Sequence, residues 1–196
     1  PKPTNQVGSQ EELLEALDSF SNIYIIRDFT VSDIINVPEG VTITGVNNPK
    51  ITMRNTLVAF KITSSNVTLN GFTIQSDTRI LRTISMGVGV LVTRPSPDSL
   101  VSVSNVNISN VTFIDIGNPT KDSYGPISVR GYNATQSSPN VSDLVPVLLP
   151  GASPFSNIVI NRCTFNNAAN NAIDFWTVKD GRISNCTFNG TFGDFN

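Results

Sequence analysis

Four short segments of the chain are close copies of one another, and an internal repeat constrains a fold more than any single residue does. Each copy contains an aliphatic residue, two small or polar residues, an apolar residue, a Thr and a final Ile or Phe. The copies are Leu69-Asn-Gly-Phe-Thr-Ile74, Ile108-Ser-Asn-Val-Thr-Phe113, Ile160-Asn-Arg-Cys-Thr-Phe165 and Ile183-Ser-Asn-Cys-Thr-Phe188. A unit this short buries its apolar side only by stacking on its neighbours. Because the copies are separated by 39, 52 and 23 residues, the repeat predicts a solenoid with unequal loops rather than a propeller of equal blades.

Local patterns along the chain predict one short helix followed only by short strands. Ser9-Gln-Glu-Glu12 has the pattern of a capping box, and apolar residues follow at helical spacing, so we expect a helix over residues 9–20. The expected strands are runs of Val, Ile, Thr and Phe bounded by Asn, Gly, Pro and Asp, namely 23–26, 29–31, 41–43, 51–53, 59–63, 67–69, 72–74, 88–93, 101–108, 111–116, 127–130, 158–160, 172–177 and 182–188. This order excludes a doubly wound α/β fold and leaves an all-β sandwich or a parallel solenoid.

The repeat favours the solenoid because its central pair of residues has the composition of a tight corner. In Ile183-Ser-Asn-Cys186 the aliphatic residue ends one strand, the Ser-Asn pair turns the chain, and the Cys begins the next strand. Such a corner requires a positive φ, which Gly adopts freely and Asn tolerates. Gly71, Asn110 and Asn185 occupy this position, and Arg162 is the exception. We expect stacked corners to align Asn side chains in a ladder of amide hydrogen bonds.

These features resemble the right-handed parallel β-helix family, also called pectin-lyase-like. The resemblance is carried by Ser65-Asn-Val-Thr-Leu-Asn-Gly-Phe-Thr-Ile74, Ser104-Asn-Val-Asn-Ile-Ser-Asn-Val-Thr-Phe113 and Asn170-Asn-Ala-Ile-Asp-Phe-Trp176, which leads into the last copy. It covers about residues 20 to 190 and implies an all-β, right-handed parallel β-helix with an N-terminal capping α-helix over 9–20. We expect 1–196 to form a single domain with a long inserted loop at 131–155. Family members include lyases, hydrolases, epimerases, phage tailspikes and surface adhesins, so the resemblance does not imply one function.

The two cysteines, Cys163 and Cys186, lie at the same place in successive copies, 23 residues apart. If 23 residues make one coil, the two residues stack directly, with Cα atoms about one strand spacing (~4.8 Å) apart. That distance permits a disulfide, although parallel Cβ directions give it poor geometry. Two alternatives stay open, a ladder of small core residues or a Cys163–Cys186 disulfide.

Composition limits the partners that the chain can bind. Charged residues make up 14%, the net charge is −2, and histidine is absent, so we expect neither nucleic acid nor an anionic membrane surface as a partner. No window approaches the ~20 apolar residues of a membrane span, and the first residues are not typical of a signal peptide. A high density of Asn-X-Ser/Thr sequons favours a secreted or cell-surface protein that is N-glycosylated, although an Asn- and Thr-rich solenoid also generates such triplets by chance. The sequons begin at Asn66, Asn107, Asn110, Asn133, Asn140, Asn185 and Asn189.

The strands that open successive coils provide the candidate functional face. Strand alternation points two columns of side chains outward, first Lys61, Leu91, Ser128 and Asp174, then Thr63, Thr93, Arg130 and Trp176. Asp174, Arg130 and Trp176 then share the groove in which enzymes of the resembled family bind polysaccharide. A sugar ring stacks on an exposed Trp, and an Arg holds a uronate carboxylate in a bidentate pair. We therefore expect these three residues to bind glycan.

Catalysis on this face has less support. A glycosidase needs two carboxylates ~5–9.5 Å apart, and this face offers only Asp174. A pectate-lyase-type site needs clustered acidic Ca²⁺ ligands and a base, whereas the Asp residues are scattered and histidine is absent. Asp174 and Arg130 are the remaining candidates for catalysis. We expect no metal and no cofactor, and favour a non-catalytic protein.

The last copy of the repeat runs into Phe188-Asn-Gly-Thr-Phe-Gly-Asp-Phe-Asn196 without a predicted covering helix. An uncovered coil exposes strand edges that pair with another chain. We therefore expect this coil to bind other copies of the protein or another extracellular protein. The leading hypothesis is a secreted β-helical structural subunit or domain of an extracellular assembly, such as a filament, fibre or adhesin. The alternatives are a polysaccharide lyase or related carbohydrate-active enzyme, and a non-catalytic glycan-binding module.

Overall fold

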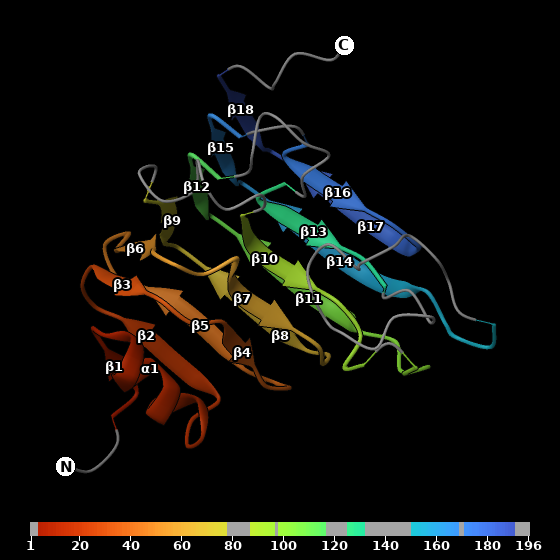
Figure 1. Cartoon of the computed structure of the whole chain (residues 1–196), viewed down its shortest axis with the longest axis horizontal. Helices are drawn as coiled ribbons and strands as arrows, with labels where there is room; N and C mark the ends of the chain where they lie inside the picture. The colour runs from red at the N-terminus through yellow and green to blue at the C-terminus, as the bar shows by residue number, and fades with distance from the viewer. Residues whose placement is uncertain are drawn as a thin grey trace.

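Three parallel β-sheets and one short helix make up the part of the chain that the structure describes (Figure 1). The structure is a computed structural model, and it describes residues 4–77, 87–96, 98–116, 125–131, 150–168 and 171–190. Every strand pair in the three sheets is parallel. The prediction of an all-β fold with a single short helix is confirmed at this level.

The sheets are named here by their size. Sheet A, the largest, contains seven strands, in the spatial order β1 (Gln6–Val7), β2 (Asn22–Ile25), β5 (Thr42–Gly45), β8 (Val67–Asn70), β11 (Ser104–Ser109), β14 (Phe155–Asn161) and β17 (Val178–Ser184). Sheet B contains six strands, β3 (Phe29–Val31), β6 (Lys50–Met53), β9 (Thr73–Ser76), β12 (Thr112–Ile114), β15 (Thr164–Asn166) and β18 (Thr187–Asn189). Sheet C contains five strands, β4 (Ile35–Val37), β7 (Val58–Ile62), β10 (Val88–Val92), β13 (Ile127–Val129) and β16 (Ile173–Phe175).

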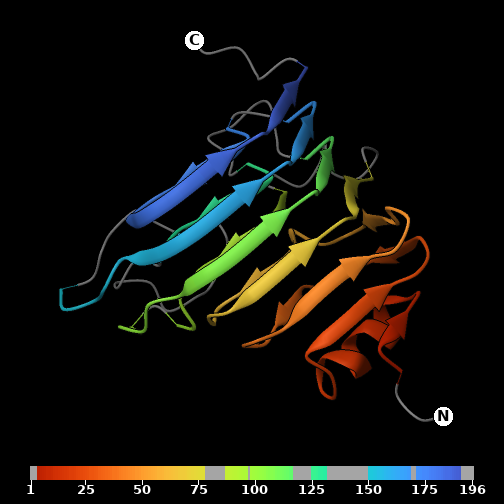
Figure 2. The same ribbon diagram turned by 180° about the vertical axis from the view of Figure 1, so that it is seen from behind.

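From β2 onward the chain visits the sheets in the fixed order A, B, C, so each strand pairs with the strand three positions later. One turn of A, B and C is one coil, and successive coils stack from the N-terminal to the C-terminal end. Figure 2 shows this stacking from behind, with the long strands of sheet A side by side in sequence order. The arrangement is a parallel β-solenoid, as the repeat predicted.

The repeat sets the register of the stack. Leu69, Ile108, Ile160 and Ile183 are aligned in one column of sheet A. The final residues of the copies form a second column, in sheet B. In that column Phe165 stacks on Phe113 with ring centroids 5.1 Å apart, and on Phe188 with centroids 5.0 Å apart. Identical side chains therefore stack over one another along the core, which confirms the alignment made from sequence.

The corner between sheets A and B has the predicted backbone conformation. Gly71, Asn110, Arg162 and Asn185 have φ values of 77°, 53°, 53° and 54°. This left-handed region is free to Gly and accessible to Asn, but it brings the Cβ of other residues close to the following carbonyl oxygen. Arg162 is thus strained relative to the residues stacked on it.

Amide hydrogen bonds between coils form at the predicted corner and also at a second one, where the chain enters the strands of sheet A. Asn157 donates from Nδ2 to Asn105 (2.8 Å), and Asn105 donates from Nδ2 to Asn66 (2.9 Å). These three residues share positive φ values of 51°, 57° and 62° and enter or bulge from the strands of sheet A. At the predicted corner, Asn110 donates to Asn70 of the coil before it (2.8 Å), and Asn185 donates to Asn161 in the same way (3.0 Å). Amide bonds are therefore present at the predicted corner, although each runs to the residue before the corner rather than from corner to corner.

Helix α1 (Gln10–Leu17) lies at the N-terminal end, where it contacts β1, β2 and β3. Ser9 Oγ accepts a hydrogen bond from the Glu12 backbone N–H (3.1 Å), and Glu12 Oε2 accepts one from the Gly8 backbone N–H (2.6 Å). Both halves of the expected capping box are present, with the Glu reaching one residue further back than usual. The apolar face of α1 packs on the core through Leu13, Ala16 and Leu17. Among the residues described, no helix has the length and apolar character needed to cross a membrane.

Both cysteines are free thiols in the structure, so the disulfide alternative is not formed. Cys163 is buried, and its Sγ donates to the Ile108 carbonyl (3.5 Å). Cys186 is half-buried, and its Sγ donates to the Ser184 carbonyl (3.3 Å). Burial raises the pKa of the Cys163 thiol to about 12, because a desolvated thiolate is unfavourable. Cys163 belongs to the buried core, and Cys186 packs against that core.

Candidate functional site

The three residues predicted to bind glycan lie together on sheet C. Asp174 follows Ser128 in one outward column, and Arg130 and Trp176 flank that column at its end. The Arg130 guanidinium donates to Asp174 Oδ2 in a close ion pair. The same guanidinium lies over the Trp176 ring, with its Cζ 5.4 Å from the ring centroid. The register from sequence therefore placed the cluster correctly.

This face is not an open groove in its middle part. The side chains of Leu91, Ser128 and Thr93 are buried although they point outward, and Asp174 is only 5% exposed. The hydroxyls of Thr93 and Ser128 have no hydrogen-bond partner among the described residues. Trp176, in contrast, is 39% exposed. A ligand thus has access to the indole ring, whereas the Asp174 carboxylate, two residues earlier in the same coil, is buried.

The pairing within the cluster bears on its chemistry. Arg130 and Asp174 neutralise each other, so neither presents a net charge to a substrate. A glycosidase needs two carboxylates, whereas this cluster contains one. Because that carboxylate is paired with a guanidinium, it is not available as a general base. Within the described parts of the chain, no three His, Cys, Asp or Glu side chains are close enough to hold a metal ion. The cluster is suited to contact a ligand through the Trp176 ring rather than to transfer a proton.

Most of the described sequons coincide with the corners of the solenoid. The side-chain amides of Asn66, Asn110, Asn185 and Asn189 all donate hydrogen bonds to a side chain in the preceding coil. The Nδ2 atom that donates these bonds is also the atom that would carry an N-linked glycan. Asn107 differs, because it lies within β11 and uses only its Oδ1, as acceptor from Ser109 Oγ (2.6 Å). The sequons at Asn133 and Asn140 lie outside the described residues.

One buried arginine, Arg94, was not among the residues that the sequence analysis assigned to a site. Arg94 is 1% exposed and donates to the carbonyls of Val101 and Ser153, at 2.6 Å each. It also lies over the Phe155 ring at 5.2 Å from the centroid. Burial lowers the pKa of Arg94. Its guanidinium therefore ties the segment before β11 to the segment before β14.

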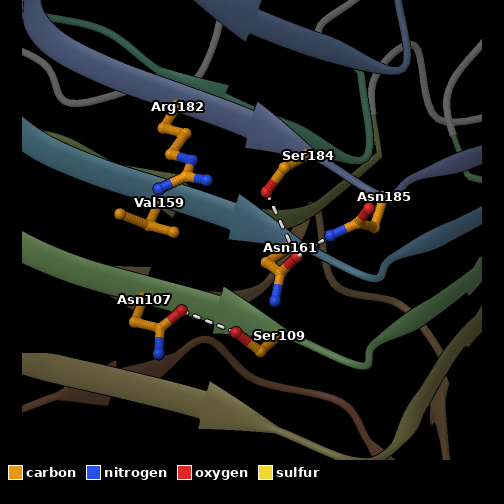
Figure 3. A pocket seen from close by; sticks show the side chains of 7 residues that line it. All are labelled: Asn107, Ser109, Val159, Asn161, Arg182, Ser184 and Asn185. Carbon is orange, nitrogen blue, oxygen red and sulfur yellow. Dashed lines mark hydrogen bonds between the residues drawn. The ribbon is translucent and has the colours of Figure 1, made fainter.

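Two hollows on the outer surface involve arginines that sequence reasoning did not assign to a site. The sheet A hollow (Figure 3) has a volume of about 420 Å³ and is lined by Asn107, Ser109, Val159, Asn161, Arg182, Ser184 and Asn185. The corner hollow has a volume of about 480 Å³ and is lined by Gly45, Asn48, Asn70, Gly71, Asn110, Thr112 and Arg162. Neither described lining contains a carboxylate. The sequence indicated the corner hollow only through Arg162, which is the one residue at this corner position that is neither Gly nor Asn.

The last described coil is far more exposed than the coils below it. Ile183 is 48% exposed, whereas Ile160 beneath it is fully buried. Phe188 is 46% exposed, whereas Phe165 beneath it is fully buried. The same columns therefore pass from full burial to half exposure within one coil.

Comparison with protein-family models, with curated proteins and with solved structures found no match for this chain.

Proposed function

We propose that the protein is a secreted, β-helical structural subunit or domain of an extracellular assembly, and that it is not a catalyst. The observation that carries this proposal is the half exposure of Ile183 at the last described coil, in a column whose other members are completely buried. A side chain that lies in the core of every other coil gains the same burial when a further layer stacks on it. The partner would be another copy of the protein or another extracellular protein that contributes this layer.

Two further inferences belong with this proposal. The order of the sheets and the asparagine corners support membership of the right-handed, pectin-lyase-like parallel β-helices, with α1 as the cap of the first coil. The sequons support secretion, because N-linked glycans are attached to chains that enter the secretory pathway. Mass spectrometry of protein secreted from a glycosylating host would show which sequons are occupied.

Electron microscopy of the purified full chain, together with size-exclusion chromatography, tests the assembly. Discrete oligomers or filaments joined end to end are expected, because the exposed columns lie at one end of the solenoid. Particles of one chain at all concentrations would contradict the assembly part of the proposal. The fold would be untouched by that result, since it does not depend on a partner.

A non-catalytic glycan-binding module is the second candidate, and the accessible Trp176 ring supports it. Arg130 packs over one face of the ring, and a sugar could stack on the part of the ring that is exposed. Titration with polyuronates should then show binding that Trp176→Ala weakens. A polysaccharide lyase would also release unsaturated products, with or without added Ca²⁺. We expect no such products, because the only basic residue of the cluster is held by Asp174.

A further inference from the structure

We infer that the outer edge of sheet A, at its corner with sheet B, is a binding site for an anionic polysaccharide. The site consists of the sheet A hollow and the corner hollow, with Arg182 in the first and Arg162 in the second. It lies on a different sheet from Trp176 and does not depend on assembly through the last coil.

The two hollows adjoin one another. Ser109 and Asn110 are consecutive residues, and the first lines the sheet A hollow while the second lines the corner hollow. The consecutive residues Asn161 and Arg162 are divided in the same way. The hollows therefore form one strip that crosses the corner, with an arginine in each part.

The strip is rich in unused hydrogen-bond donors. The guanidinium groups of Arg162 and Arg182 have no hydrogen-bond or ion-pair partner among the described residues, and both side chains are exposed. Figure 3 shows Arg182 reaching from β17 toward Val159 on β14. Asn161 Oδ1 accepts hydrogen bonds from Ser184 Oγ (3.1 Å) and Asn185 Nδ2 (3.0 Å). Its own amide nitrogen makes no bond within the described structure, so it remains available to a ligand.

The conformation of Arg162 indicates that the arginine does not serve the corner itself. At a φ of 53° it occupies a position filled by Gly71, Asn110 and Asn185 in the other coils. Those residues adopt this conformation at lower cost. Strained residues of this kind concentrate at binding sites. A guanidinium kept at a strained corner, without an acid beside it in the described structure, is matched by an anionic group supplied by a ligand.

The polar side chains that line the hollows, and the outward side chains of sheet A in the same columns beyond the hollows, favour a polysaccharide as the carrier of that anionic group. Outward Thr42, Thr68 and Asn107 form one column of sheet A, and Thr44, Asn70, Ser109 and Asn161 form the next. The columns run along the solenoid axis with one side chain per strand spacing, ~4.8 Å. Hydroxyls and amides both donate and accept hydrogen bonds, as sugar hydroxyls do. Val159 is the only apolar side chain that lines the two described hollows, which disfavours a lipid or an apolar peptide.

The test is binding of the full chain to three probes, measured by isothermal titration calorimetry. Alginate carries carboxylates, dextran sulfate carries sulfates, and dextran is neutral. We expect binding to at least one anionic probe, weakened by added salt, and no binding to dextran. The preferred anionic probe assigns the anionic group. Binding to neither anionic probe, or equal binding to dextran, would overturn the inference.

Three variants locate the site. Arg162→Asn and Arg182→Gln should each weaken binding about tenfold or more, the usual effect of losing a charged hydrogen bond. Arg162→Asn installs the residue found at the stacked corners, so its fold and melting temperature should be preserved. Lys179→Gln is the matched control, since it removes the same charge from an exposed position on β17 that lines neither hollow. Equal binding by all three variants, or binding lost only in Trp176→Ala, would contradict the assignment.

Discussion

The stacked phenylalanines of sheet B provide the sharpest test of the solenoid core. Phe165 is fully buried between Phe113 and Phe188, with near-parallel rings at interplanar angles of 4° and 7°. Phe165→Ala removes this ring and leaves a cavity, for which ~3–5 kcal/mol of the free energy of unfolding is the usual loss. Phe165→Leu keeps most of the volume and loses two ring pairs of ~0.5–1.5 kcal/mol each, so ~1–3 kcal/mol is expected.

Urea-induced unfolding followed by circular dichroism measures both variants against the unmodified chain. Phe188→Ala serves as the comparison, because the ring of Phe188 is 46% exposed and its removal should cost about half as much as that of Phe165. A loss below ~1.5 kcal/mol for Phe165→Ala would refute the buried stack, since deletion of a fully buried Phe costs more than that. An equal loss for Phe165→Leu and Phe165→Ala would show that ring stacking, rather than filled volume, dominates the site.

Three further predictions concern other parts of the molecule. Arg130→Gln should lower the free energy of unfolding by ~3–5 kcal/mol in urea titrations, because it leaves the buried Asp174 carboxylate unpaired, and Asp174→Asn in addition should recover part of the loss. The Cys163 thiol has a pKa of about 12 in the folded chain and a lower pKa, ~8.5, when unfolded. The free energy of unfolding should therefore be unaffected by this thiol below pH ~8.5 and fall as the pH rises toward 12. A pH series in which the free energy of unfolding of Cys163→Ala falls equally steeply would contradict this. Asn105→Ala should lower the free energy of unfolding by ~2 kcal/mol or more, and Asn105→Gly by less, because both variants lose the amide hydrogen bonds but only Ala is strained at a positive φ. Equal melting temperatures for the two variants would exclude the backbone contribution.

The repeat predicted much of the fold because its physical cause is local. Aligning the copies placed Ile108 over Leu69 and Phe165 over Phe113, since a stacked strand must present the same face at the same position. The corner at Gly71 followed from the need for a positive φ. Strand β4 was missed because it is only three residues long, which is too short for an alternating pattern to be recognised in the sequence.

The features that sequence did not predict depend on contacts between distant segments. The burial of Arg94 depends on the carbonyl of Ser153, 59 residues away, which the Pro- and Ser-rich neighbours of Arg94 in the sequence do not reveal. Asp174 was expected in an open groove, whereas it is buried and paired with Arg130, 44 residues away. Arg182 gave no signal, because an exposed arginine in a strand is ordinary until its neighbours on β11 and β14 are known.

Sedimentation velocity over a range of concentrations tests the proposed assembly most directly. The unmodified chain should sediment as an oligomer, and Ile183→Asp should return it to a single chain, because a charge at this exposed position of the last coil opposes a stacked layer. Leu14→Asp is the matched control, since Leu14 is exposed on α1 at the opposite end, and it should leave the oligomer intact. A single-chain species for the unmodified protein at every concentration, or an oligomer that survives Ile183→Asp and is lost in Leu14→Asp, would contradict the proposal.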